Sequence, residues 1–332
     1  MPRSSPRALG RKSITPTPIR LKELKRALRR PFEWLGIGLG MLILSNLDHK
    51  ALFALCDFCS RVMFRFDRRG KARSLANLRV IFGGSGPMTR REELIIRGSY
   101  RNMARTVGHV FWTSKHAAAR VAQVGEMCPE GHKWLQEKKQ AVTVSGHIGC
   151  WEILAQLVHL EGLQMISVAK RIGSQRMTEM LMASRRSIGE EIVPADGAFK
   201  SLMAAMKAGK SLGLLVDQTV RPKDGGVWIR FFGRPLPVSA APAFFSARFK
   251  APIVTAWSRP LKDGRYRCEV INTYESEAAK DVWAMTQRCA WDLEGVIRRH
   301  PSLWVMNYNL FRKVPTPEDL ATLAAREAKL QR

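Results

Sequence analysis

The most informative stretch of the chain is Val142-Thr-Val-Ser-Gly-His-Ile-Gly-Cys-Trp-Glu152. An apolar run of strand length leads into Gly146 and His147, and a second glycine at position 149 allows a sharp turn. A helix is expected to begin near Trp151. A strand, a glycine-rich turn and a helix in this order favour an α/β fold built from βαβ units.

The same alternation continues along the chain. Further strands are expected at 165–169, 211–216, 252–257 and 265–271, and helices at 151–161, 174–188, 199–208, 240–249 and 279–299. Upstream, helical periodicity covers 90–112, with an apolar stripe of Leu94, Ile95, Gly98, Met103 and Val107. We expect an α/β fold with a mostly parallel or mixed central sheet flanked by helices. It should occupy residues 80–315, followed by a charged tail at 316–332.

Composition and charge limit the kinds of partner. The 332 residues are 45% hydrophobic, which is a globular profile, and 55 Lys and Arg against 28 Asp and Glu leave a net charge of +27. So large an excess of positive charge indicates a negatively charged partner: a nucleic acid, an anionic membrane surface, or an acidic protein or substrate. The six cysteines are scattered without zinc-ribbon spacing, which favours a reducing compartment and predicts no metal site.

The N-terminal region combines cations with apolar residues. Residues 1–31 hold ten cations and one acid and are expected to form a disordered basic tail. The fourteen residues 34–47 carry no charge, whereas a bilayer span needs about 20. Cations flank the apolar stretches on both sides, so residues 32–79 are expected to be a membrane-associated helical segment, for which an interfacial or re-entrant anchor fits better than a single crossing. The alternative is an ordinary buried helix under a solvated tail.

His147 and Glu152 are the candidate catalytic pair. Within one helix, a spacing of five would put them on different faces, so they can meet only if His147 lies in the loop before the helix. A carboxylate beside an imidazole favours a general base that takes a proton from a hydroxyl. No Gly-x-Ser-x-Gly elbow is present and Cys150 follows the histidine too closely to be a clear nucleophile, so direct attack by a substrate alcohol is expected. A chance match of this short spacing is the alternative.

Other residues suit a substrate site around this pair. The backbone N–H groups of Gly149, Cys150 and Trp151, at a helix N-terminus, are candidates for an oxyanion hole. Arg171 and Arg185 suit phosphate oxygens. Further candidates for substrate binding are Asp217 and Gln218, just past a strand's carboxyl end, and Phe232 and Gly233, which could shape an acyl-chain groove. A turn-capping role for Asp217 and core packing for the phenylalanines are the alternatives.

The segment Ser145-Gly-His-Ile-Gly-Cys-Trp-Glu152 resembles the H-x4-D/E block of membrane glycerolipid acyltransferases, in the form used by bacterial lipid A late acyltransferases. The resemblance extends over about residues 30–313, with Cys150 standing where the family usually has Asn. Further segments similar to that family, in the same order, are Arg73-Ser-Leu-Ala-Asn-Leu78, Arg171, Arg185, Leu212-Gly-Leu-Leu-Val-Asp-Gln218, Gly226-Val-Trp-Ile-Arg-Phe-Phe-Gly-Arg-Pro235 and His300-Pro-Ser-Leu-Trp-Val-Met-Asn-Tyr-Asn309.

This resemblance implies acyl transfer from an acyl thioester, on acyl carrier protein or coenzyme A, to a hydroxyl of a lipid A precursor or similar glycolipid. His147 would be the base and Glu152 its partner, with no cofactor and no metal, at the cytoplasmic face of the bacterial inner membrane. The same chemistry on a lysophospholipid, a phosphatidylinositol mannoside or an ornithine-type lipid stays open, as does an inactive membrane scaffold. A basic nucleic-acid-binding protein is the rival from another class, but zinc-finger spacing and an RNP1 motif are absent, so no nucleic acid is expected.

Overall fold

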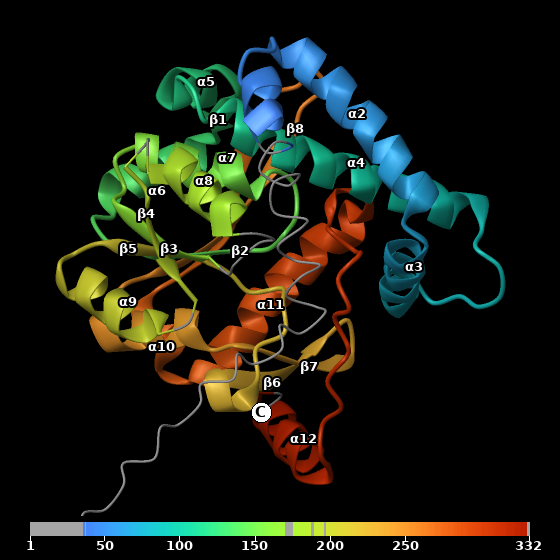
Figure 1. Cartoon of the computed structure of the whole chain (residues 1–332). Coiled ribbons are helices and arrows are strands. Elements are labelled where there is room, and N and C mark those ends of the chain that lie inside the picture. The colour runs from blue at the N-terminus through green and yellow to red at the C-terminus, as the bar shows by residue number, and fades with distance from the viewer. Residues whose placement is uncertain (1–35, 37, 170–174, 187–188, 196, 331–332) are drawn as a thin grey trace, which may run out of the picture.

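The computed structural model describes residues 36, 38–169, 175–186, 189–195 and 197–330 (Figure 1). The expected basic tail at 1–31 lies outside the described residues, as does Arg171.

Within the described residues, seven strands form one mixed sheet in the order β1-β9-β8-β2-β5-β3-β4. Neighbouring strands are parallel except for the pair β8–β9, which is antiparallel. The expected α/β fold with a mostly parallel or mixed sheet is therefore confirmed. The strands are β1 Gly125–Met127, β2 Val142–Ser145, β3 Met165–Ala169, β4 Glu191–Pro194, β5 Ser211–Leu215, β8 Ile253–Pro260 and β9 Tyr266–Tyr274.

Helices cover both faces of the sheet, with α7 and α8 on one side and α9 and α10 on the other (Figure 1). A separate hairpin of β6 Gly226–Phe231 and β7 Arg234–Ser239 lies against α11. The helices are α2 His49–Phe66, α3 Arg68–Phe82, α4 Arg90–Trp112, α5 Ala117–Val124, α6 Pro129–Glu137, α7 Trp151–Leu160, α8 Gln175–Arg186, α9 Ala198–Lys207, α10 Ala241–Phe249, α11 Val282–Arg299 and α12 Pro317–Leu330.

The alternation of side chains along β2 and Ala141, the residue before it, divides the core into two parts. Val142 and Val144 are fully buried in a cluster with residues of α9, α10 and α11. Ala141 belongs to a second cluster, formed with α5, α7 and part of α2. Successive strand residues point to opposite faces, so a single short strand anchors both helical layers.

Helix α4 has the expected bounds, and its buried face agrees only in part with the expected stripe: Gly98 is buried and Ile95 and Met103 pack against the core. Leu94 and Val107, predicted to lie on the apolar stripe, are 54% and 47% exposed. Beside the apolar Ile96, Tyr100, Val110 and Trp112, the buried face carries polar and small residues: Gly98, Ser99, Asn102, Thr106, Gly108 and His109. The stripe prediction was wrong at those two positions because polar side chains of this helix, and not only apolar ones, face the interior.

The C-terminal residues form α12 in place of the expected charged tail. Leu323 on this helix is buried, and Glu327 accepts a hydrogen bond of 3.0 Å from Nε of Arg230 on β6. The helix is therefore part of the packed domain.

The N-terminal helices α2 and α3 pack against α4. Arg105 of α4 binds both carboxylate oxygens of Asp57 of α2, at 2.7 Å each, and Phe64 meets the ring of Tyr100 edge-on. In the part of the chain that the structure describes, no helix is both long and apolar enough to span a bilayer.

Candidate active site

The register of the sheet brings His147 and Asp217 together. In the ladder between the parallel strands β2 and β5, Val142 lies opposite Leu212 and Ser145 lies opposite Leu215, an offset of 70 positions. His147 and Asp217 keep the same offset two residues beyond the carboxyl ends of these strands, and Nδ1 of His147 lies 2.7 Å from Oδ1 of Asp217. Carboxyl ends of parallel strands are where open α/β sheets form ligand sites.

Asp217 is buried and engaged at both of its oxygens. Its Oδ2 accepts the backbone N–H of His147 at 2.8 Å and the indole N–H of Trp304 at 2.9 Å. Burial alone would raise the pKa of this carboxyl, but the charge of His147 and these hydrogen bonds together lower the pKa below its ordinary value. Asp217 is therefore held as the carboxylate.

An ionised carboxylate can only accept hydrogen bonds. The proton in the contact between His147 and Asp217 is therefore on Nδ1 of His147. The lone pair of a neutral imidazole then lies on Nε2. Nε2 of Gln218 lies 3.2 Å from that atom, and the Trp151 ring meets the imidazole ring edge-on at 4.9 Å between centroids. Since the His147 side chain is 21% exposed, it can be reached from solvent.

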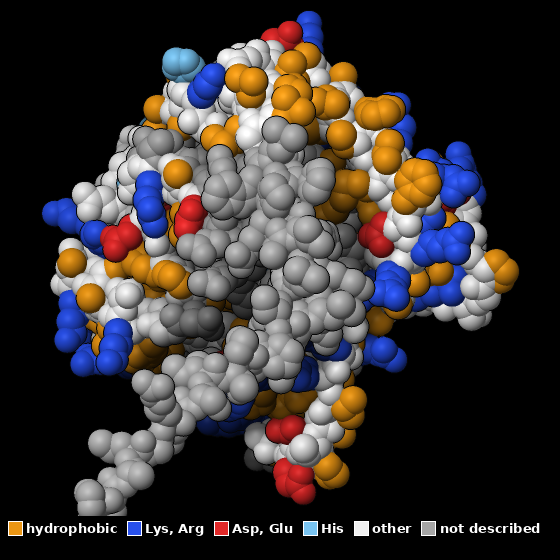
Figure 2. Space-filling view, in the orientation of Figure 1, with side chains coloured by type: hydrophobic (Ala, Val, Ile, Leu, Met, Phe, Trp, Pro, Cys, Tyr) orange, Lys and Arg blue, Asp and Glu red, His pale blue; other side chains and the backbone are white. Residues whose placement is uncertain are grey.

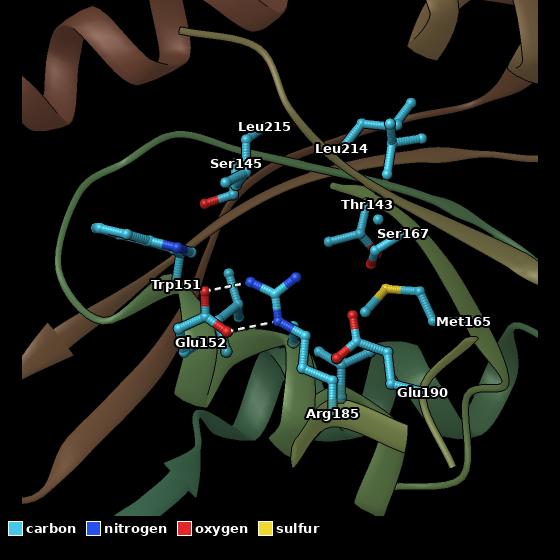
Figure 3. A pocket seen from close by; sticks show the side chains of 15 residues that line it. Thr143, Ser145, Trp151, Glu152, Met165, Ser167, Arg185, Glu190, Leu214 and Leu215 are labelled. Carbon is cyan, nitrogen blue, oxygen red and sulfur yellow. Dashed lines mark hydrogen bonds and ion pairs between the residues drawn. The ribbon is translucent and has the colours of Figure 1, made fainter. Parts of the chain in front are cut away.

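The predicted pairing of His147 with Glu152 was wrong, because Glu152 is paired elsewhere. Arg185 of α8 donates to both carboxylate oxygens of Glu152, one of them at 2.8 Å from Nε, and both side chains are largely buried (Figure 3). Although burial disfavours a charged guanidinium, the adjacent Glu152 raises the pKa of Arg185 above its ordinary value. Arg185, predicted to bind phosphate, is thus neutralised by Glu152.

This ion pair lies in the wall of a cavity of about 70 Å³ between the sheet and helices α7 and α8 (Figure 3). Hydroxyl groups of Thr143, Ser145 and Ser167 line its sheet side, and Glu190 lies across from Glu152. Burial raises the pKa of Glu190 while Arg185 opposes that shift. Apolar side chains complete the wall: Leu154, Ala155, Val158, Met165, Val168, Leu214 and Leu215.

Two of the three backbone N–H groups that were predicted to form an oxyanion hole already donate hydrogen bonds within the fold. The N–H of Gly149 donates to the carbonyl of Leu303 at 3.0 Å, and that of Cys150 donates to the carbonyl of Ser258 at 3.3 Å. Neither N–H group is therefore available to a substrate oxygen. A role for the N–H of Trp151 in an oxyanion hole stays a prediction.

The loop that carries His147 is tightly packed. Gly149 has φ of +62°, and a Cβ there would lie 1.7 Å from the carbonyl oxygen of Ser258. Cys150 is fully buried, which raises the pKa of its thiol to about 12. A protonated, buried thiol is a poor nucleophile, in agreement with the expectation that Cys150 does not attack the substrate.

The model of the bacterial lipid A biosynthesis acyltransferase family matches residues 20–313 of the chain. The chain belongs to this family. That membership makes it an acyltransferase of the lipid A biosynthesis class. A search of curated proteins gives no match.

In this lipid A acyltransferase, the expected site residues Phe232 and Gly233 belong to the turn of the β6–β7 hairpin and not to the His147 loop. Phe232 is buried against the ring of Trp304, with 6.0 Å between ring centroids, and Gly233 forms the exposed turn of the β6–β7 hairpin with φ of +75°. Neither lines the cavity beside Glu152. The alternative of core packing fits the phenylalanine better than an acyl-chain groove.

Sequence reasoning placed Asp217 among the substrate-binding residues but missed it as the partner of His147. The signal was present, because each residue follows its strand by two positions. Among the described residues no group of three or more metal-ligating side chains comes together.

Proposed function

We propose that this enzyme transfers a fatty acyl group from an acyl thioester to a lipid hydroxyl, with His147 as general base and Asp217 as the carboxylate that orients it. The observation that carries the proposal is the contact of 2.7 Å between Nδ1 of His147 and the buried Asp217. It leaves Nε2 as the basic nitrogen on a partly exposed side chain.

The chemistry needs two proton transfers through Nε2. The imidazole takes the proton of the acceptor hydroxyl as its oxygen attacks the thioester carbonyl carbon, which gives a tetrahedral intermediate. The C–S bond then breaks and the imidazolium returns the proton to the departing thiolate, so an ester and a free thiol are formed. Asp217, kept ionised in the fold, stabilises the imidazolium between the two transfers.

In this proposal Glu152 acts through Arg185 and not on the imidazole. The pair joins the first turn of α7, which follows the His147 loop, to α8. Both charges are largely buried, so each needs the other. We therefore assign to Glu152 the positioning of α7 beside the reaction site.

The donor that fits best is an acyl carrier protein. A net charge of +27 would steer an acidic carrier toward the enzyme, whereas coenzyme A offers a much smaller charged surface. The acceptor we propose is a hydroxyl of a lipid A precursor or similar glycolipid, which accords with the family.

We also propose that the enzyme works at an anionic membrane surface, at the cytoplasmic face of the bacterial inner membrane. Helix α2 exposes Phe58, Val62, Met63 and Phe66 along its outer side, at 40–74% of each residue's surface. Apolar side chains gather over this helix, with Lys and Arg beside them (Figure 2). An exposed apolar stripe flanked by cations is typical of an interfacial helix.

Vesicle binding tests this membrane assignment. Phe66→Glu and Phe58→Glu should weaken binding to vesicles of phosphatidylglycerol and phosphatidylethanolamine, whereas Val314→Glu, at a still more exposed apolar residue just before α12, should leave binding unchanged. Equal binding of all three variants would contradict the assignment.

Lipid mass spectrometry tests the reaction and identifies the acceptor. Host membranes are compared with and without the gene, after complementation with wild type, His147→Ala or Asp217→Asn. One lipid should lose a fixed acyl mass that only the wild type restores in full. Full restoration by His147→Ala would refute the mechanism. An unchanged lipid profile in the host without the gene would refute the choice of acceptors and turn attention to salt-dependent binding of nucleic acid.

A further inference from the structure

Helix α4 supports the catalytic loop with a row of small and polar residues. Gly98, Asn102 and Thr106 follow one another at intervals of four, which places them on one face of the helix. All three are buried. Two segments lie against this face: the His147 loop and the chain around Trp304.

Asn102 joins these two segments. Its side-chain amide donates to the carbonyl of Gly149 at 2.9 Å and to the carbonyl of Leu303 at 2.8 Å. The N–H of Gly149 also donates to Leu303, at 3.0 Å, so Asn102, Gly149 and Leu303 form a closed triangle of hydrogen bonds. Only a primary amide offers two N–H donors on one atom at this side-chain length, which accounts for Asn at this position.

Both segments lead directly to the catalytic pair. On one side, Gly149 is two residues from His147. On the other, Trp304 follows Leu303 and donates its indole N–H to Asp217. The segments also bind each other, because the N–H of Val305 donates to the carbonyl of His147 at 3.0 Å.

Neighbouring residues of α4 tighten the same contact. A Cβ on Gly98 would lie 2.6 Å from Cβ of Ser302, so a glycine is needed for the chain around Trp304 to approach the helix this closely. Ser99 donates its hydroxyl to the carbonyl of Trp304 and accepts the N–H of Met306 at 3.3 Å.

We infer that Asn102 is a positioning residue of the acyl-transfer reaction, which fixes His147 and Asp217 relative to each other by holding their two loops on α4. The inference rests on the proposed role of the pair. A displacement of about 1 Å of catalytic groups is enough to lower a rate by about 100-fold.

The test compares Asn102→Leu with Asn77→Leu in the full-length protein. Asn77 is a matched control, since its buried amide also donates to two carbonyls of the same downstream segment, those of Met306 and Tyr308, at 2.8 and 2.7 Å. Neither of these two hydrogen bonds of Asn77 involves a residue of the His147 loop. Both variants lose two hydrogen bonds and should be comparably destabilised.

The first measurement does not need activity. Protein labelled with 15N-histidine should give a low-field proton signal from the Nδ1–H of His147 against Asp217, assigned by its loss in His147→Ala. We expect Asn102→Leu to lose or shift this signal and Asn77→Leu to keep it. An unchanged signal in Asn102→Leu, or an equal change in both variants, overturns the inference.

The second measurement is transfer from acyl carrier protein thioesters to extracted host lipid. Asn102→Leu should lower kcat at least tenfold with KM for the thioester within twofold, and Asn77→Leu should stay close to the wild type. If the wild type itself shows no transfer, the proposed function fails, and the histidine signal alone decides on Asn102. If Asn102→Leu does not fold, the same two measurements are made on Asn102→Ser, which keeps one hydrogen-bond donor. A His147 signal and a kcat equal to those of the wild type in Asn102→Ser would overturn the inference.

Discussion

Replacing Asp217 with Asn, and separately Glu152 with Gln, distinguishes the two carboxylates of the site. Asn has the shape of Asp but lacks its charge, and its amide opposes Nδ1 of His147 at a distance of 2.7 Å. The imidazolium then loses its counter-charge and the tautomer is no longer fixed. We expect kcat to fall by about 10⁴-fold, the loss typical of such a change in a His–Asp pair, which corresponds to about 5.4 kcal/mol of activation free energy.

Glu152→Gln should act on stability instead. It leaves the largely buried guanidinium of Arg185 without a counter-charge, which costs about 3–5 kcal/mol of unfolding free energy. The double variant Glu152→Met with Arg185→Met should recover much of that loss, because it removes both charges.

The assay is acyl transfer normalised to folded protein, beside urea unfolding of the same samples in detergent. Asp217→Asn should unfold at a urea concentration close to that of the wild type, whereas Glu152→Gln should keep most of its kcat per folded molecule. The opposite pattern, with an active Asp217→Asn and a stable but inactive Glu152→Gln, would refute the pairing of His147 with Asp217.

Three further predictions follow from other contacts. Trp304→Phe removes one hydrogen bond from Asp217 and should lower kcat about tenfold with little change in the melting temperature. Gly149→Ala should yield no folded protein in a detergent extract, whereas Gly225→Ala, also at positive φ but in open space, should cost only about 1 kcal/mol in a urea titration. Burial lowers the pKa of His109 to about 3, so between pH 6.5 and 3 the unfolded state binds a proton that the folded state does not. Stability should therefore fall by about 1.4 kcal/mol per pH unit from this group as the pH is lowered, and thermal melts of His109→Asn should lack that component. An unchanged slope in that variant would contradict this assignment.

Most of the strands that were predicted from the sequence are short, largely buried runs that lie between helices, and β9 was predicted from the turn that precedes it. The bounds of β2, β3 and β5 agree with the expected ranges to within one residue. The hairpin β6–β7 was missed because Pro235 and Pro237 lie in its second strand, and proline argues against a strand. The edge strand β4 is short and only Ile192 in it is buried, so its pattern is weak.

The catalytic geometry was harder to predict because it depends on contacts between distant segments. His147 was found from its local setting, but its partner lies 70 positions away and is selected by strand register. Asn102 was missed for another reason. Periodicity analysis treats polar residues as the exposed face of a helix, whereas α4 buries Asn102 and Thr106 to bind a loop.

The ladder between β2 and β5 has a consequence for how the chain can be rearranged. The catalytic pair is connected through backbone hydrogen bonds of two adjacent strands, and the turn that ends the crossover of α7, β3, α8, β4 and α9 lies outside that ladder. Insertions, deletions or new chain ends in the exposed turn at Gly209, just before β5, leave the ladder intact and therefore leave the pair in place. This turn is a suitable site for circular permutation or for fusing a reporter.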